Sequence, residues 1–158
     1  FHLIAGIGRR GVNDGEMSDA YLANVRYPPA ELARHDMTLL LEAINTRDIP
    51  GFYLNTSRQA FDVMDAAGAS NVRFQYDVYH MQIMEGDLAT TLKTHLARIG
   101  HIQIADPPAR NEPGTGEINY SFLFDWLDQI GYTGWVGCEY RPRTTTVEGL
   151  GWFRKWIS

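Results

Sequence analysis

The chain has 158 residues, of which 44% are hydrophobic and 21% are charged, and its formal net charge is −5. This hydrophobic content excludes a disordered chain and suffices for one globular domain with a substantial core. The acidic excess argues against a surface for nucleic-acid phosphates, which requires clustered lysine and arginine. No run of residues is as long and apolar as a membrane span. We therefore expect neither nucleic acid nor membrane as a partner.

The single cysteine, Cys138, cannot form an internal disulfide, and this fits a reducing compartment. The first residues lack the basic-then-apolar order of a signal peptide. We therefore expect a soluble, cytoplasmic protein. The chain opens with FHLIAG, which looks like a strand already under way. This opening suggests a piece of a longer protein.

In chain order, five short apolar runs are predicted as strands, and segments with helical spacing follow each of them. The strands are mostly apolar on both faces, as in parallel sheets that are covered on both sides. Ser57, Asp87 and Ser121 are expected to cap helices, and Gly100 to stop one. The predicted strands cover residues 1–5, 37–44, 72–76, 101–105 and 135–138.

Five consecutive βα units indicate a parallel sheet within a single domain over residues 1–158. Two architectures fit this order: an open doubly wound sheet, or part of an eight-stranded (β/α)₈ TIM barrel. The positions of the polar residues distinguish them.

Four of the five strands carry near their ends a group that can bind a hard cation: Glu42, Asp77, Gln103 and Glu139. One such group per βα unit would place all four on the same rim of a barrel, where active sites lie, so the pattern favours the barrel. Carboxylate and amide oxygens suit Mg²⁺ or Mn²⁺. Without a cation, the carboxylates would repel and at least one would be driven toward protonation. Any one of them alone is more often a helix cap or a solvated loop residue.

His80 follows Asp77 by three residues, and we expect it on a loop above the rim, where it could contact a substrate oxygen or simply close a loop. Arg110, in the long loop after the fourth strand, is the best candidate for gripping an anionic group. Gln103 lies between His101 and Asp106, which leaves the choice of ligand open there. No role is assigned to His2, His35 and His95, and His101 is expected to be structural.

Four motifs in order resemble the hydroxypyruvate isomerase family of the xylose isomerase-like barrels: LLLEAINTRDIPGFYL, QYDVYHMQIMEGDL, GHIQIADPPARNEPGTGEINY and GYTGWVGCEYRP. The resemblance implies a (β/α)₈ barrel and an aldose–ketose type isomerase of carbohydrate and glyoxylate metabolism. Its small hydroxy-keto acid substrate would be hydroxypyruvate, converted to 2-hydroxy-3-oxopropanoate (tartronate semialdehyde).

The resemblance also assigns roles. It implies that Glu42 and Glu139 are the acid/base pair. The expected ligands of a divalent metal, Mg²⁺ or Mn²⁺, are Glu42, Asp77, Gln103 and Glu139. His80 and Arg110 would contact the substrate. The family usually has Pro where this chain has Ala43, and its first three βα units have no counterpart here. Five units cannot close an eight-stranded barrel alone.

The expected reaction is a proton transfer between adjacent carbons through an enediolate. Two alternatives remain. The same rim could serve a 2-oxo-tetronate isomerase or a ketose 3-epimerase. The chain could also be an inactive, truncated barrel that only binds metal or self-associates into a homo-oligomer through its open strand edges.

Overall fold

In a computed structural model, which describes residues 1–156, five parallel strands form one sheet in chain order, β1-β2-β3-β4-β5. The parallel sheet predicted from the βα alternation is therefore confirmed. Within the described part of the chain, the sheet is open, because β1 and β5 each pair with one neighbour only. The strands are β1 (His2–Leu3), β2 (Leu39–Glu42), β3 (Val72–Asp77), β4 (Ile99–Ile104) and β5 (Val136–Cys138).

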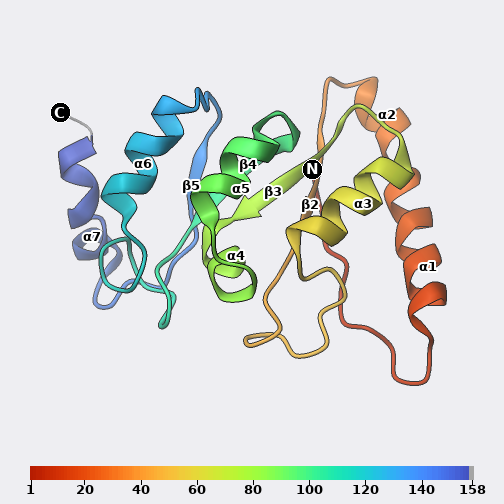
Figure 1. The fold of residues 1–158 in the computed structure, drawn as a ribbon, viewed down its shortest axis with the longest axis horizontal. Helices are drawn as coiled ribbons and strands as arrows, with labels where there is room; N and C mark the ends of the chain where they lie inside the picture. The colour runs from red at the N-terminus through yellow and green to blue at the C-terminus, as the bar shows by residue number, and fades with distance from the viewer. Residues whose placement is uncertain (157–158) are drawn as a thin grey trace.

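Helices connect the strands and follow one another across the molecule, from α1 at one end to α7 at the other (Figure 1). None of those between residues 1 and 156 is both long enough and apolar enough to cross a bilayer. The α-helices are α1 (Asp14–Arg26), α2 (Pro29–Ala33), α3 (Ser57–Ala67), α4 (Val78–Met84), α5 (Leu88–His95), α6 (Tyr120–Gln129) and α7 (Thr146–Gly149), and the 3₁₀ helices are η1 (Leu96–Arg98) and η2 (Gly151–Trp156).

The two faces of the sheet differ, so the prediction that the strands are apolar on both faces is wrong for β3 and β4. One face joins the hydrophobic core under the helices, and residues such as Phe74, Tyr76 and Ile102 are fully buried there. The other face is polar, because neighbouring strands pair Gln75 with His101 and, further along, Asp77 with Gln103. Successive side chains alternate between faces, so the polar residues of each strand gather on one side. This side carries the candidate site.

Three predicted helix boundaries differ from the structure. The expected caps Ser57 and Ser121 lie inside their helices, because Thr56 and Asn119 precede the first turns and accept hydrogen bonds from backbone N–H groups there. Gly100 does not stop a helix but lies in β4. A Cβ at this position would come within 2.7 Å of the Arg73 Cβ, so the glycine permits close packing of adjacent strands.

The long loop after β4 is folded around the buried carboxylate of Asp106. Its oxygens accept hydrogen bonds from the backbone N–H groups of Gly114, at 2.9 Å, Gly116, at 2.9 Å, and Ile118, at 3.1 Å. Because both oxygens are engaged within the loop, Asp106 serves loop structure and is not free to take the place of Gln103 as a ligand.

We expect Asp106→Asn to lower the free energy of unfolding by about 2–3 kcal/mol, because an amide leaves at least one buried N–H group without an acceptor. Chemical denaturation would measure the change. Asp125→Asn, an exposed position on α6, is the matched control and should change stability by less than about 0.5 kcal/mol. Equal effects of the two substitutions would contradict this role of Asp106.

Candidate active site

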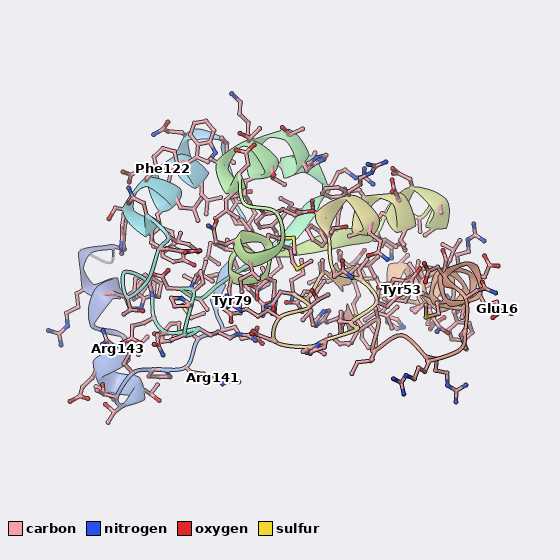
Figure 2. All side chains as sticks on the ribbon, turned by 60° about the horizontal axis from the view of Figure 1, so that its bottom comes forward. Glu16, Tyr53, Tyr79, Phe122, Arg141 and Arg143 are labelled. Atoms are coloured by element: carbon pink, nitrogen blue, oxygen red, sulfur yellow. The ribbon has the colours of Figure 1, made fainter. Side chains whose placement is uncertain are left out.

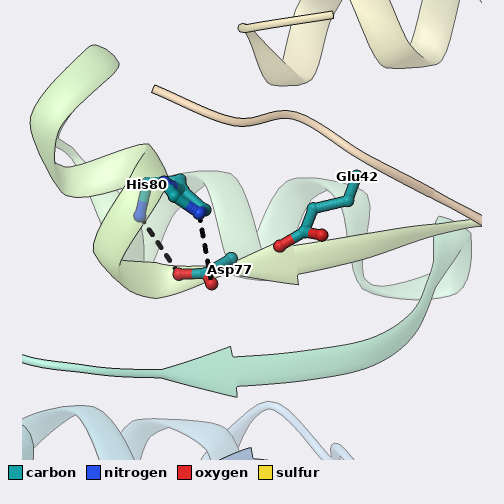
Figure 3. Close-up of side chains that lie close together, drawn as sticks. All are labelled: Glu42, Asp77 and His80. Atoms are coloured by element: carbon teal, nitrogen blue, oxygen red, sulfur yellow. Dashed lines mark hydrogen bonds and ion pairs between the residues drawn. The ribbon is translucent and has the colours of Figure 1, made fainter. Parts of the chain in front are cut away.

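Two carboxylates, Glu42 and Asp77, meet at the carboxyl ends of adjacent strands. Glu42 is the last residue of β2 and Asp77 the last residue of β3, and both are almost fully buried. Figure 3 shows the Glu42 carboxylate pointing toward Asp77 and His80. On the other side of Glu42, the His2 Nε2 atom lies 3.2 Å from its Oε2 atom. Because adjacent parallel strands end at the same edge of the sheet, the two negatively charged side chains are buried close together.

Asp77 divides its two oxygens between structure and site. Its Oδ1 atom accepts a hydrogen bond of 3.1 Å from the backbone N–H of His80 and so caps helix α4. Its Oδ2 atom is buried without a hydrogen-bond partner. The cap expected of an isolated strand-end carboxylate is therefore present, and one oxygen still remains for other chemistry.

The surroundings of Asp77 raise the pKa of its carboxyl to about 7, chiefly through burial and then through the negative charge of Glu42. The hydrogen bond from His80 and the positive charge of Arg110, whose Nη2 atom lies 3.9 Å from Oδ2, act in the opposite direction but do not cancel it. Asp77 is therefore partly protonated near neutral pH unless positive charge is added beside it.

His80 lies in the first turn of α4 and is buried, so the expectation that it lies on a loop above the rim is wrong. The strand passes directly into the helix, because Asp77 caps it without an intervening loop. Two groups of Asn45, the backbone N–H at 3.3 Å and the side-chain nitrogen at 2.6 Å, contact the His80 Nδ1 atom. Burial, followed by the charge of Arg110, lowers the pKa of His80 to about 4, so the imidazole is neutral at pH 7.

Arg110 and Glu139 form an ion pair beside the buried carboxylates. The Arg110 Nη2 atom donates to the Glu139 Oε2 atom at 2.6 Å, and the guanidinium carbon lies 5.0 Å from the centre of the Tyr79 ring. Glu139 follows β5 and its side chain is 52% exposed. Arg110 adopts a left-handed backbone conformation, with φ of 58°. Its Nη2 atom lies between Glu139 and Asp77 and so links the two carboxylates.

Gln103 lies beside Asp77, its direct partner across β3 and β4. Its Oε1 atom accepts a hydrogen bond of 2.6 Å from the side chain of Gln75. Gly137 pairs with Gln103 on the next strand, and Glu139 follows two residues later on the same side. The four predicted strand-end groups thus belong to one face of the sheet, with Glu42 and Asp77 buried at its centre.

Three side chains could hold a metal ion: the ligand atoms of Glu42, Asp77 and His80 all lie within 4.8 Å of one another. The Oε1 atom of Glu42 and the Oδ2 atom of Asp77 are buried and lack hydrogen-bond partners. Uncompensated buried carboxylate oxygens are costly, and a divalent cation satisfies such oxygens. The two carboxylates therefore fit a divalent metal.

The sequence did not single out His2, Asn45 or Gln75 as parts of this site. Strand alternation counted back from Asp77 could have indicated Gln75, which pairs with Glu42 on the same face. His2 lies on β1, and its position beside Glu42 follows from strand pairing rather than from a spacing in the sequence. No spacing signal predicts Asn45, because its contact with His80 joins residues 35 positions apart.

Known proteins resemble this chain over nearly its whole length. The hydroxypyruvate isomerase of Escherichia coli (strain K12) is 49% identical over 142 residues, which cover 90% of this chain and 55% of that protein. The 2-oxo-tetronate isomerase of Cupriavidus necator is 44% identical over 156 residues, covering 99% of this chain and 60% of that protein. The chain thus spans less than two thirds of the length of these relatives.

Solved structures show the same architecture. A crystal structure described as AP endonuclease, family 2 from Brucella melitensis matches with a TM-score of 0.94 and 39% identity, covering 99% of this chain and 60% of that one. The 3-keto-D-glucoside 4-epimerase of E. coli matches with a TM-score of 0.81 and 26% identity, covering 93% and 57%. The resemblance to hydroxypyruvate isomerases is confirmed, and the five-stranded sheet is part of a barrel. A family model described as "Xylose isomerase-like TIM barrel" matches residues 1–156, and the chain belongs to that family.

Proposed function

We propose that this chain provides the metal-binding rim and both acid/base glutamates of a hydroxypyruvate isomerase. The observation that carries the proposal is the buried pair of Glu42 and Asp77, each with an unpaired oxygen, beside the ion pair of Arg110 and Glu139. The similarity to the E. coli hydroxypyruvate isomerase supports this choice of reaction.

Glu42 and Asp77 would hold a divalent metal, Mg²⁺ or Mn²⁺, and Gln103 and Glu139 from the next two strands would complete the ligand set. Their shared face of the sheet and their oxygen donors support this assignment. When bound, the cation supplies positive charge that stabilises the negative oxygen formed on the substrate during proton transfer.

The two glutamates would exchange protons with the substrate carbons. One carboxylate takes a proton from carbon 3 of hydroxypyruvate, giving an enediolate across carbons 2 and 3, and the other delivers a proton to carbon 2. A proton also passes from the carbon 3 hydroxyl to the carbon 2 oxygen, so the product is the isomeric aldehyde without net gain or loss of atoms. Glu42 and Glu139 take these two roles in an order that the proposal leaves open.

The substrate carboxylate would bind near Arg110, which the geometry of a guanidinium favours. A cavity of about 370 Å³ adjoins the site and is lined partly by Tyr79, Arg110 and Arg141. In Figure 2, Tyr79 and Arg141 lie on the same side of the molecule, one from α4 and the other from the segment after β5. Two arginines at one small cavity support an anionic substrate.

A 2-oxo-tetronate isomerase is the second candidate, because the Cupriavidus necator enzyme of that name is 44% identical over 99% of this chain. Its substrate class is also a small hydroxy-keto acid, so the same rim and arginines would serve it. Comparing kcat/KM for three-carbon and four-carbon acids separates the two: a preference of more than tenfold for the four-carbon acid would favour the second candidate.

We further propose that residues 1–158 are one partial barrel domain, and that turnover needs the complete ring. The chain alone is expected to be inactive. The same chain fused behind the first three βα units of the E. coli relative is expected to convert hydroxypyruvate, as measured by substrate loss and uptake of solvent deuterium. Equal turnover by both forms would contradict the need for ring closure.

In the active form, Glu42→Gln and Glu139→Gln should each lower kcat at least about 1,000-fold, because an amide can neither accept nor return the proton. Glu16→Gln, at an exposed position on α1, is the matched control and should leave kcat unchanged. If either site variant kept a rate near that of the parent, the acid/base assignment would be wrong.

In the metal-free protein, the stabilising contribution of Asp77 should be lost as pH rises from about 4 to about 7, because folding raises the pKa of Asp77 from 3.8 to about 7 and so favours its protonated form. Folding lowers the pKa of His80 from 6.5 to about 4, which acts in the opposite direction below about pH 6.5, so the Asp77 contribution is measured as the difference between the parent and Asp77→Asn at each pH. At pH 8, Asp77→Asn should therefore raise the free energy of unfolding by about 2–4 kcal/mol without metal. Added Mg²⁺ or Mn²⁺ should stabilise the parent but not this variant.

Thermal unfolding across pH, with and without the metal salt, tests this expectation. Asp62→Asn, at an exposed position on α3, is the control and should keep both the pH dependence and the metal response. A parent protein whose stability ignored divalent ions at pH 8 would contradict the proposed metal site.

A further inference from the structure

The imidazole of His80 is held from one side by Asn45. The backbone N–H of Asn45 donates to the His80 Nδ1 atom at 3.3 Å, and the Asn45 Nδ2 atom lies 2.6 Å from the same nitrogen. A backbone nitrogen can only donate, so Nδ1 must be the acceptor and carry no proton. In a neutral ring, the proton then lies on Nε2.

The orientation of the Asn45 side chain is fixed by Asp48. The backbone N–H of Asp48 donates to the Asn45 Oδ1 atom at 2.7 Å, and the Asn45 Nδ2 atom donates to the Asp48 Oδ2 atom at 3.2 Å. If the amide oxygen and nitrogen were exchanged, the NH₂ group would face the backbone N–H of Asp48, and the oxygen would face the Asp48 carboxylate. Neither contact could form a hydrogen bond. The NH₂ group therefore faces His80.

Asp48 is itself held in place by Tyr79 and Arg47. The Tyr79 hydroxyl donates to the Asp48 Oδ2 atom at 2.7 Å, and Arg47 donates to the Tyr79 hydroxyl at 3.2 Å. Asn45 is fully buried. A buried amide whose oxygen and nitrogen both have fixed partners has one arrangement available. That arrangement fixes which nitrogen of the His80 ring accepts a hydrogen bond.

The opposite nitrogen of His80 faces the candidate site. Its Nε2 atom lies 3.8 Å from the Asp77 Oδ2 atom, which is longer than a hydrogen bond. Figure 3 shows this nitrogen turned toward the two carboxylates. An Nε2–H group here can donate to an oxygen placed between them, but it has no lone pair free to bind a metal.

We propose that Asn45, oriented by Asp48, is a positioning residue that fixes His80 as the tautomer protonated at Nε2. His80 then donates a hydrogen bond to an oxygen of the substrate and does not act as a metal ligand, although it lies within reach of one. The substrate contact rests on the proposed isomerase function, whereas the tautomer is a property of the protein alone.

A long-range proton–nitrogen correlation NMR spectrum tests the tautomer directly, with His80→Asn used to identify the signals of His80 among the five histidines. The parent should show a protonated, pyrrole-type Nε2 and an unprotonated, pyridine-type Nδ1, and diamagnetic Mg²⁺ should leave this pattern in place. A protonated Nδ1, or an Nε2 that becomes a ligand when Mg²⁺ is added, would overturn the proposal.

Asn45→Asp replaces the side-chain donor at 2.6 Å with a carboxylate oxygen, whose closer contact and charge should outweigh the backbone N–H at 3.3 Å and move the proton to Nδ1 or protonate both nitrogens. In the form that turns over hydroxypyruvate, kcat should fall about 10–100-fold, with a smaller change in KM. Asn119→Asp, the same change at an exposed helix cap, should alter neither the His80 signals nor kcat. Asn45→Ala, which removes the side-chain donor without adding charge, should lower kcat in the same direction.

The two hypotheses fail separately. If the tautomer is as expected and hydroxypyruvate is not converted, the isomerase assignment fails and the role of Asn45 stands. If hydroxypyruvate is converted while Asn45→Asp leaves both the His80 signals and kcat unchanged, the role of Asn45 fails alone.

Discussion

The candidate site depends on one electrostatic constraint, the burial of two carboxylates at the ends of adjacent strands. Glu42 and Asp77 each retain an oxygen that the surrounding protein does not satisfy. The protein relieves this repulsion in part, because the pKa of Asp77 rises to about 7 and Arg110 approaches it. Neither response satisfies both oxygens. A site that is strained in this way without a cation is well suited to bind one.

The sheet creates this constraint through the different character of its two faces. Packing of the helices against one face needs apolar residues such as Phe74 and Ile102, which supply the core. The other face is then free to carry polar groups, since alternate side chains of each strand point that way. In β3 and β4, one set of alternate residues therefore packs in the core and the other set carries polar groups. Asp77 belongs to the polar set, so the end of β3 can hold it without disrupting the core.

The sequence predicted the strands, their parallel order and the four strand-end groups, because hydrophobic runs and polar strand ends are local signals. It did not predict that one face of β3 and β4 is polar, since Gln75 and His101 interrupt runs that look apolar as a whole. It placed His80 on a loop, because a helix that begins directly at Asp77 leaves no separate cap signal. The contact between Asn45 and His80 depends on tertiary packing and has no local signal. The roles of the site residues remain predictions.

The shared use of Asp77 limits which residues this position can accept. Asparagine could still cap α4 but would bring no charge to the site, whereas glutamate would carry the charge on a longer side chain that moves it away from the cap. Serine could cap the helix but could not offer a second oxygen. Only aspartate meets both demands at once. Selection for helix stability and selection for chemistry therefore act on the same side chain, and neither can change it without cost to the other.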